Sequence, residues 1–348
     1  MNIFFIEFRD PLFGIIVFFA LVFMITLFSY WWGRYKAQED SKQLDKFLKG
    51  FRTAPTQNEL KVLISSGELS EKSWLILANS YFKNGEYEKS IEIYHELLAL
   101  KKTSNQKETL FLLGQTYFKA GFLERAKEVL LEILKKNPRT PQALTSLLLI
   151  YENMKRYDLA LDVLEPLIEL DQDVSIERIY INFLLIFDDY KISTDEKVKK
   201  ILGLYKEDSY LTYMVFQYLF RIDAKLAWLN LDIQKADLIV DILWQLDKKD
   251  LDLDIISTSN YLKELYSARG DVALATKSSI FELDVLINLD KKVNATLGFE
   301  YVCSKCNWSS PFAFHRCTKC NSIDTLKIDI NLIKNFSIDF DMQNDSFV

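Results

Sequence analysis

The sequence predicts an all-α protein: an apolar helix, then a helical solenoid, then a small cysteine-rich knuckle. Three observations predict this order: a 22-residue apolar run near the N-terminus, a repeat of about 34 residues in the middle, and four cysteines in two pairs near the end. Ten glycines and six prolines in 348 residues leave little turn chemistry for a many-stranded β protein. A hydrophobic content of 49% excludes general disorder.

Charge and histidine content argue against two broad functions. The net charge of −6 disfavours a protein that coats nucleic acid, because such proteins usually carry a basic face. Only two histidines occur, His95 and His315, which makes a histidine-dependent catalytic centre a poor hypothesis. The hydrolase, zinc-protease and P-loop motifs are also missing. The sequence therefore predicts no enzyme and no nucleic-acid partner.

The first segment to explain is the uncharged apolar run from Pro11 to Trp32. As a helix rising 1.5 Å per residue it would span about 33 Å, enough for a hydrocarbon core of roughly 30 Å. The alternative is a cleaved signal peptide, but the run is too long and Glu7, Arg9 and Asp10 precede it. We expect a retained, single transmembrane helix over residues 11–33.

Basic residues predict the orientation of this helix. Arg9 is the only basic residue before it, whereas six follow within about twenty positions: Arg34, Lys36, Lys42, Lys46, Lys49 and Arg52. The positive-inside rule then leaves residues 1–10 outside as a short stub and places the bulk of the chain in the cytoplasm. Residues 34–70 are expected to form a juxtamembrane helical linker.

The middle of the chain repeats itself, most clearly over residues 71–172. Three tyrosines share one register, 36 and then 34 residues apart: Tyr81, Tyr117 and Tyr151. Small residues recur three positions before and nine positions after them: Ala78, Gly114, Ser90, Ala126 and Ala160. This resembles the tetratricopeptide pattern, in which helical hairpins bury their apolar faces by stacking on one another. A generic helical bundle is the alternative.

Details within the repeats predict where each first helix ends. Gly85 and Gly121 lie four residues after their tyrosines, where the chain must turn, and Lys155 takes that place in the third unit. Leu148 replaces the small residue there, so this unit is imperfect. Beyond residue 172 the register fades, although Tyr266 and Gly270 repeat the four-residue spacing. We expect degenerate hairpins as far as residue 290.

The four cysteines form two C-x₂-C pairs separated by ten residues: Cys303, Cys306, Cys317 and Cys320. Two such turns supply four thiolates, which make a tetrahedral site for one zinc or iron ion. Asn307 and Asn321 follow the second cysteine of each pair, where the turn commonly needs positive φ. Thiol exchange is the alternative chemistry. His315 lies beside the site, but four cysteines already complete the ligand shell.

The aromatic residues between the two cysteine pairs are Trp308, Phe312 and Phe314. They are expected to pack the small domain or to dock it on the last helices. We predict a metal-binding domain over residues 298–330 and a tail over residues 331–348. About thirty residues cannot build an adequate core alone, so the ion is expected to supply folding energy.

The whole order resembles the lipopolysaccharide assembly protein B family of Gram-negative bacteria, whose C-terminal domain is rubredoxin-like. Four places carry the resemblance: Gly33–Gln38, Gly114–Ala126, Leu147–Leu170 and Tyr301–Lys327. The resemblance implies a single-pass inner-membrane protein with residues 1–10 in the periplasm and its bulk in the cytoplasm. It also implies an adaptor that restrains lipopolysaccharide synthesis.

Such an adaptor helps a membrane AAA protease to degrade the deacetylase that commits precursor to lipid A. It also contacts lipopolysaccharide assembly proteins, partly through its membrane helix. Two alternatives remain open: a membrane-tethered scaffold for another envelope complex, such as a secretion or division assembly, and an iron electron-transfer protein. The sequence does not decide whether the chain forms a homodimer.

Overall fold

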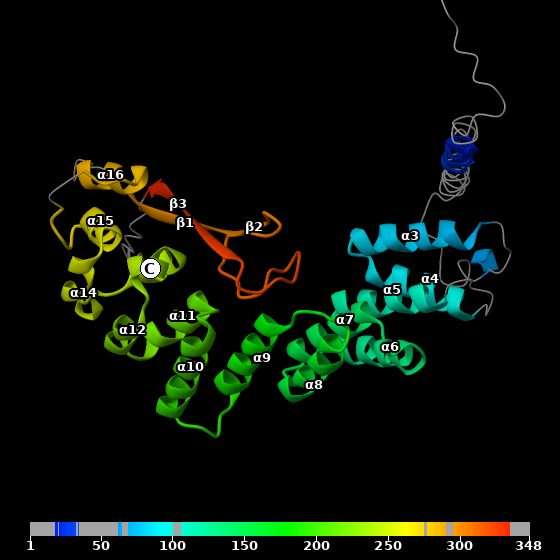
Figure 1. The fold of residues 1–348 in the computed structure, drawn as a ribbon, viewed down its shortest axis with the longest axis horizontal. Helices are drawn as coiled ribbons and strands as arrows, with labels where there is room; N and C mark the ends of the chain where they lie inside the picture. The colour runs from blue at the N-terminus through cyan, green and yellow to red at the C-terminus, as the bar shows by residue number, and fades with distance from the viewer. Residues whose placement is uncertain are drawn as a thin grey trace, which may run out of the picture. The chain divides into compact units, whose positions relative to one another are not determined.

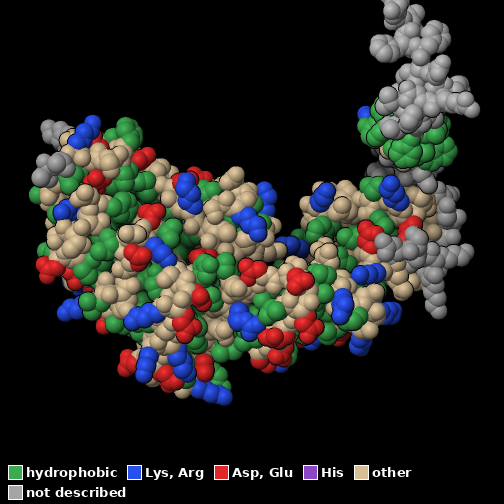
Figure 2. Space-filling view, in the orientation of Figure 1, with side chains coloured by type: hydrophobic (Ala, Val, Ile, Leu, Met, Phe, Trp, Pro, Cys, Tyr) green, Lys and Arg blue, Asp and Glu red, His purple; other side chains and the backbone are tan. Residues whose placement is uncertain are grey.

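The computed structural model describes residues 18–19, 21–32, 34, 62–64, 69–99, 106–274, 277–289 and 295–334 (Figure 1). The chain divides into two compact units, Met1–Asp171 and Gln172–Val348, and each is described by itself. Basic and acidic side chains are interspersed on the face of each unit seen in Figure 2, without a continuous basic surface there.

The transmembrane helix expected over residues 11–33 lies partly outside the described residues. Residues 21–32 are helical, and their large apolar side chains are exposed. Among the residues that the structure describes, no helix combines the length and apolar character needed to cross a bilayer. The stub over residues 1–10 and most of the linker over residues 34–70 also lie outside the described residues.

The described part of unit 1 consists of helix hairpins that follow one another along the chain. Their helices are α3 (Glu71–Lys83), α4 (Tyr87–Ala99), α5 (Gln106–Lys119), α6 (Leu123–Lys136), α7 (Pro141–Asn153) and α8 (Tyr157–Ile168). Each helix contacts the next one, and α5 also contacts α7 in the neighbouring hairpin. These contacts stack the hairpins as the repeat pattern predicts.

One hydrogen bond closes the turn of all three hairpins. The carbonyl oxygen of each register tyrosine accepts the N–H of the residue five positions later, at 2.9 Å in every case: Glu86 to Tyr81, Phe122 to Tyr117 and Arg156 to Tyr151. The residue between is left-handed, with φ of 81° at Gly85, 83° at Gly121 and 56° at Lys155. This is the Schellman ending of a helix, and it confirms the predicted turn positions.

Small residues lie where the helices approach one another. Ala78, Ala126 and Ala160 are fully buried, and so is Ser90. A Cβ added to Gly114 would lie 3.1 Å from Leu130 Cδ2, so α5 and α6 approach too closely there for a larger residue. Leu148 is also buried, which shows that the third hairpin accommodates a larger side chain at the matching position.

Unit 2 begins with two helices as long as those of unit 1, followed by shorter and less regular ones. In order they are α9 (Ser175–Asp188), α10 (Thr194–Asp208), α11 (Thr212–Ile222), α12 (Ala224–Asn230), α13 (Val240–Gln245), α14 (Leu253–Thr258), α15 (Asn260–Ala268) and α16 (Phe281–Asn288), with 3₁₀ helices η1 (Ile233–Ile239) and η2 (Lys248–Asp250). Tyr266 and Gly270 repeat the turn of unit 1: Asp271 N–H donates to the Tyr266 carbonyl at 2.9 Å, and φ of Gly270 is 82°.

The expectation of an all-α chain is wrong at its C-terminal end. A three-stranded antiparallel sheet has the order β2-β1-β3, formed by β1 (Ala295–Cys303), β2 (Ser309–Ser310) and β3 (Leu326–Lys334). Cys303 pairs with Leu326 at one end and Ala295 with Lys334 at the other. The strands therefore extend beyond the domain expected over residues 298–330, and residues 331–334 are strand rather than tail. The alternation of polar and apolar residues in β3 is a strand pattern.

Two glycines in helix interiors form a matched test of the packing in unit 1. Alanine at Gly203 in α10 would meet nothing within 4 Å, so we expect it to stabilise unit 2 by up to about 1 kcal/mol through helix propensity. Alanine at Gly114 gains the same propensity but crowds Leu130, and overpacking costs about 1–3 kcal/mol. In urea unfolding, the free energy of unfolding should therefore rise for Gly203→Ala and fall for Gly114→Ala. Stabilisation by Gly114→Ala would contradict the close approach of α5 and α6.

The second prediction for unit 1 concerns its stability in acid. His95 Nε2 on α4 lies 2.6 Å from Tyr117 Oη on α5, and burial, together with the charge of Arg125, lowers the pKa of His95. The unfolded chain, with a histidine pKa near 6.5, then binds the proton first. The free energy of unfolding should therefore fall as the pH drops below about 6.5. The loss between pH 7.5 and 5.5 should be smaller in His95→Gln; an unchanged loss would exclude His95 as its source.

Candidate metal centre

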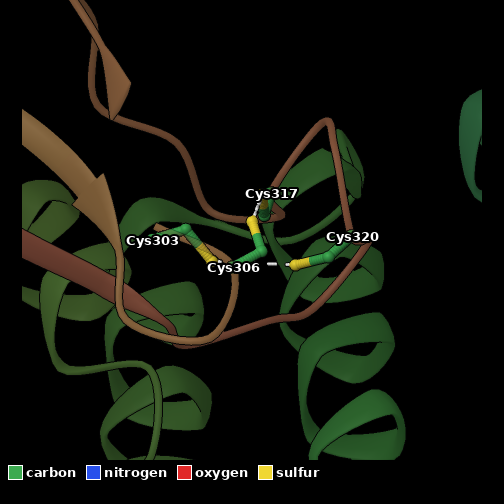
Figure 3. Close-up of side chains that lie close together, drawn as sticks. All are labelled: Cys303, Cys306, Cys317 and Cys320. Carbon is green, nitrogen blue, oxygen red and sulfur yellow. Dashed lines mark hydrogen bonds between the residues drawn. The ribbon is translucent and has the colours of Figure 1, made fainter. Parts of the chain in front are cut away.

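The structure brings the four predicted cysteines together. Cys303 ends β1 and Cys306 lies in the turn that follows, while Cys317 precedes a second turn and Cys320 lies in it (Figure 3). All four sulfurs lie within 4.8 Å of one another. The Sγ atoms of Cys303 and Cys320 are 3.6 Å apart, and those of Cys306 and Cys317 are 3.7 Å apart.

The two cysteine turns have the same hydrogen bonds. Asn307 N–H donates to the Cys303 carbonyl and Asn321 N–H to the Cys317 carbonyl, both at 2.8 Å. The asparagines have φ of 53° and 58°, which confirms the left-handed conformation predicted for them. The first cysteine of each turn also donates its own N–H at 2.9 Å, Cys303 to the Trp308 carbonyl and Cys317 to that of Ser322.

The sulfur positions fit a metal ion. All four thiols are free, and separations of 3.6 and 3.7 Å are far longer than a disulfide bond of about 2.05 Å. The corners of a tetrahedron with metal–sulfur bonds of 2.3 Å lie about 3.8 Å apart, so both distances match such edges. Zinc and iron both accept four thiolates. Bound there, the ion would offset part of the negative charge of the thiolates and join the two turns.

Burial and hydrogen bonds shift the pKa values of the cysteine thiols in different directions. Burial opposes ionisation of Cys303, but the Thr325 hydroxyl, 3.3 Å from its sulfur, and backbone N–H groups of Lys305 and Cys306 lower its pKa to about 6. The hydroxyl and N–H of Ser322 lower the pKa of Cys320. Burial and the contacts with the neighbouring sulfurs instead raise the pKa of Cys306. A cation among the sulfurs would remove this mutual opposition to ionisation.

The residues that lie between the two cysteine pairs in the sequence have different surroundings in the structure. The four-cysteine cluster does not include His315, whose ring lies 6.1 Å from that of Tyr213 on α11. Burial lowers the pKa of His315. Trp308 and Phe314 pack against each other with ring centroids 5.7 Å apart, as expected. Phe312 does not pack: its side chain is exposed, which corrects the expectation for this residue.

A buried carboxylate, which no sequence motif marks, joins this region to the helices. Asp241 Oδ2 on α13 accepts hydrogen bonds from Tyr213 Oη at 2.7 Å and from Tyr301 Oη on β1 at 2.8 Å. Burial, and then Asp241 itself, raise the pKa of both tyrosines, so both remain protonated donors at neutral pH. One signal was available: Asp241 is a lone acid within the apolar run Leu238–Leu243.

Comparisons with known proteins identify the class of the helical hairpins. Residues 73–108 match a family model of the tetratricopeptide repeat, and residues 93–167 match a model of anaphase-promoting complex (cyclosome) subunit 3. The match over the first hairpin, α3 and α4, supports the predicted tetratricopeptide pattern, and the other two hairpins repeat its turn. No curated protein matches the chain, and the resemblance to the lipopolysaccharide assembly protein B family stays a prediction.

Similar solved structures include a MamA double mutant (RS-1), with 22% identity over 46% of this chain and 89% of that one and a TM-score of 0.34. YrrB, described as a TPR protein with an unusual peptide-binding site, has 16% sequence identity. The match covers 62% of this chain and 100% of YrrB, with a TM-score of 0.32. BtubC from P. vanneervenii has 14% sequence identity. The match covers 70% of this chain and 94% of BtubC, with a TM-score of 0.30.

Proposed function

We propose that this chain is a scaffold that binds other proteins through its tetratricopeptide repeats and carries a structural metal ion in its cysteine cluster. One observation carries the proposal: the hairpins of unit 1 repeat the same turn and bury small residues at matching positions, and a tetratricopeptide model matches residues 73–108. Stacked repeats expose one long surface to partners. A shell of four cysteines leaves no open position for a substrate, so the ion acts in folding.

The surface of unit 1 offers a place where a partner can dock. A hollow of about 250 Å³ lies where α5 and α7 begin, beside α6. It is lined by Lys107, Glu108, Phe111, Ile133, Thr140 and Gln142. Charged, amide and apolar groups together suit a peptide segment, because they can pair with its backbone and hold an apolar side chain.

The finer proposal places this scaffold at the bacterial inner membrane, held by residues 11–33 with its bulk in the cytoplasm. The uncharged run before Gly33 and the basic residues after it support this placement. The resemblance over Tyr301–Lys327 supports a role as the adaptor that brings the lipid A-committing deacetylase to a membrane AAA protease. A tether would raise the effective concentration of the repeats near such membrane partners.

Site-specific crosslinking in native membranes tests the proposal. A photo-crosslinking residue at exposed Gln142, in the hollow, is compared with one at exposed Asp162 on α8. We expect the protease and the deacetylase to be recovered from Gln142 and not from Asp162. Recovery of a secretion or division complex would replace the lipopolysaccharide role with that of another envelope scaffold. Equal recovery from both positions, or none, would exclude the hollow as the docking place.

The four sulfurs also fit iron, which keeps electron transfer as a second candidate function. Metal analysis and voltammetry of the purified chain decide between the two. A reversible one-electron signal would favour electron transfer, and a chain that holds only zinc would exclude it.

A further inference from the structure

The cysteine-bearing segment does not stand apart from the helices of unit 2. The segment over residues 303–323, here called the cysteine lobe, is continuous with β1, and side chains of β1 and of this lobe contact α13 and α9. Tyr301 on β1 donates to Asp241 on α13, and Trp244 Nε1 on the same helix lies 3.3 Å from Thr296 Oγ1 on β1. Arg316, which precedes Cys317, lies 5.0 Å from the ring centroid of Tyr180 on α9.

Among these residues, Asp241 is the one whose burial costs the most free energy. It is only 3% exposed, and the described residues provide no hydrogen-bond partner for its Oδ1 atom. Removing a carboxylate from water without a cation is expensive, so hydrogen bonds from two phenols at 2.7 and 2.8 Å carry much of its stabilisation. The link that Asp241 makes from α13 to α11 and β1 therefore depends on both tyrosines staying in place.

One of these tyrosines lies on the same strand as a candidate metal ligand. Tyr301 and Cys303 are two residues apart on β1, so their side chains leave the same face of the strand about 7 Å apart. The strand is held along its full length by pairing with β3, from Ala295 to Cys303. A shift of Cys303 on loss of the ion would therefore displace the hydroxyl that donates to Asp241.

We infer that Asp241 is a positioning residue that couples the metal state of the cysteine lobe to the packing of α11 and α13. With an ion bound, β1 keeps the Tyr301 hydroxyl hydrogen-bonded to Asp241, and Asp241 joins α13 to both α11 and β1. Without the ion, β1 loosens and Asp241 loses one of its two donors. Because coupling is reciprocal, weakening the Asp241 contacts also weakens retention of the ion. This coupling rests on the metal site of the proposed function, lies within unit 2, and is the same whichever partner the repeats bind.

Hydrogen exchange of the wild-type full chain is the first test and requires no variant. The chain is loaded with Zn²⁺, and exchange is followed by mass spectrometry before and after removal of Zn²⁺ with EDTA. We expect exchange in α11 and α13 to rise on the order of tenfold, the effect of losing one hydrogen bond to a charged group. Helices α5 and α7 of unit 1 serve as the internal reference and should not change. Unchanged exchange in α11 and α13 would overturn the inference.

Two phenylalanine variants then distinguish coupling between the metal site and α13 from a purely structural role of the tyrosines. Tyr301→Phe cuts the link between β1 and Asp241, so release of Zn²⁺ to EDTA should quicken about tenfold, and exchange in α13 should lose its dependence on Zn²⁺. Tyr213→Phe leaves that link intact, so α13 should keep its Zn²⁺ dependence. Tyr190→Phe is the matched control, because that side chain is 88% exposed. Identical behaviour of Tyr301→Phe and Tyr190→Phe would refute the role of Asp241.

Discussion

The chain carrying Cys303→Ser is expected to retain almost no zinc and to lose the sheet of unit 2. Cys303 is fully buried and is both a candidate ligand and the last residue of β1. The free energy of binding a structural zinc, about 10–16 kcal/mol in small zinc peptides, is also folding free energy. Removing one thiolate should therefore cost unit 2 several kcal/mol, seen as loss of zinc by elemental analysis and a lower melting temperature.

The neighbouring variant Ser304→Ala controls for changes in this turn. Ser304 is exposed, and its backbone N–H donates to the Thr325 carbonyl at 2.8 Å, an interaction that alanine keeps. This variant should bind zinc and melt like the wild-type chain. If Cys303→Ser bound zinc as the wild type does, the four-sulfur site would not be a metal centre.

The second large effect is expected from Trp228→Ala, in the helical part of unit 2. Trp228 is 2% exposed, and its ring centroid lies 5.3 Å from that of Phe220 and 6.5 Å from that of Tyr266. Its Nε1 atom also donates to the Asp250 carbonyl at 2.9 Å. Alanine would leave a cavity and an unpaired carbonyl, so we expect a loss of about 3–5 kcal/mol in the stability of unit 2.

The adjacent residue provides the control for this variant. Leu229 is 76% exposed, so Leu229→Ala should change stability by no more than about 0.5 kcal/mol. Because the chain has two units, hydrogen exchange resolved by helix is a better measurement than one unfolding midpoint. Equal effects of the two variants would mean that the aromatic cluster around Trp228 does not stabilise unit 2.

The helices of unit 1 were predictable because their pattern recurs. The tyrosine register, the small residues and the glycine turns each have a local physical cause, and the structure places them as predicted. Lys155 shows the limit of residue identity: it takes the left-handed position that glycine holds in the other hairpins. In unit 2 the short elements between Ala224 and Thr258 depend on tertiary packing, so periodicity alone could not assign them.

The cysteine spacing predicted the candidate metal site, whereas its attachment to the helices could not be predicted. Two C-x₂-C turns with asparagine at the left-handed position form a local motif, independent of the rest of the fold. The contacts of Asp241 with Tyr213 and Tyr301 join residues 28 and 60 positions apart. No local pattern encodes such pairs, although a lone acid in an apolar helix is a sign that partners exist. The sheet was missed even though β3 alternates polar and apolar residues.

The unequal exposure of the four cysteines has a kinetic consequence. Cys303 and Cys317, the first of each pair, are fully buried, whereas Cys306 and Cys320 are partly open to solvent. A competing chelator or an oxidant such as peroxide must therefore attack from the side of the second cysteines, one sulfur at a time. Alkylation of the partly stripped chain should label Cys306 and Cys320 first, while the inner pair still grips the ion.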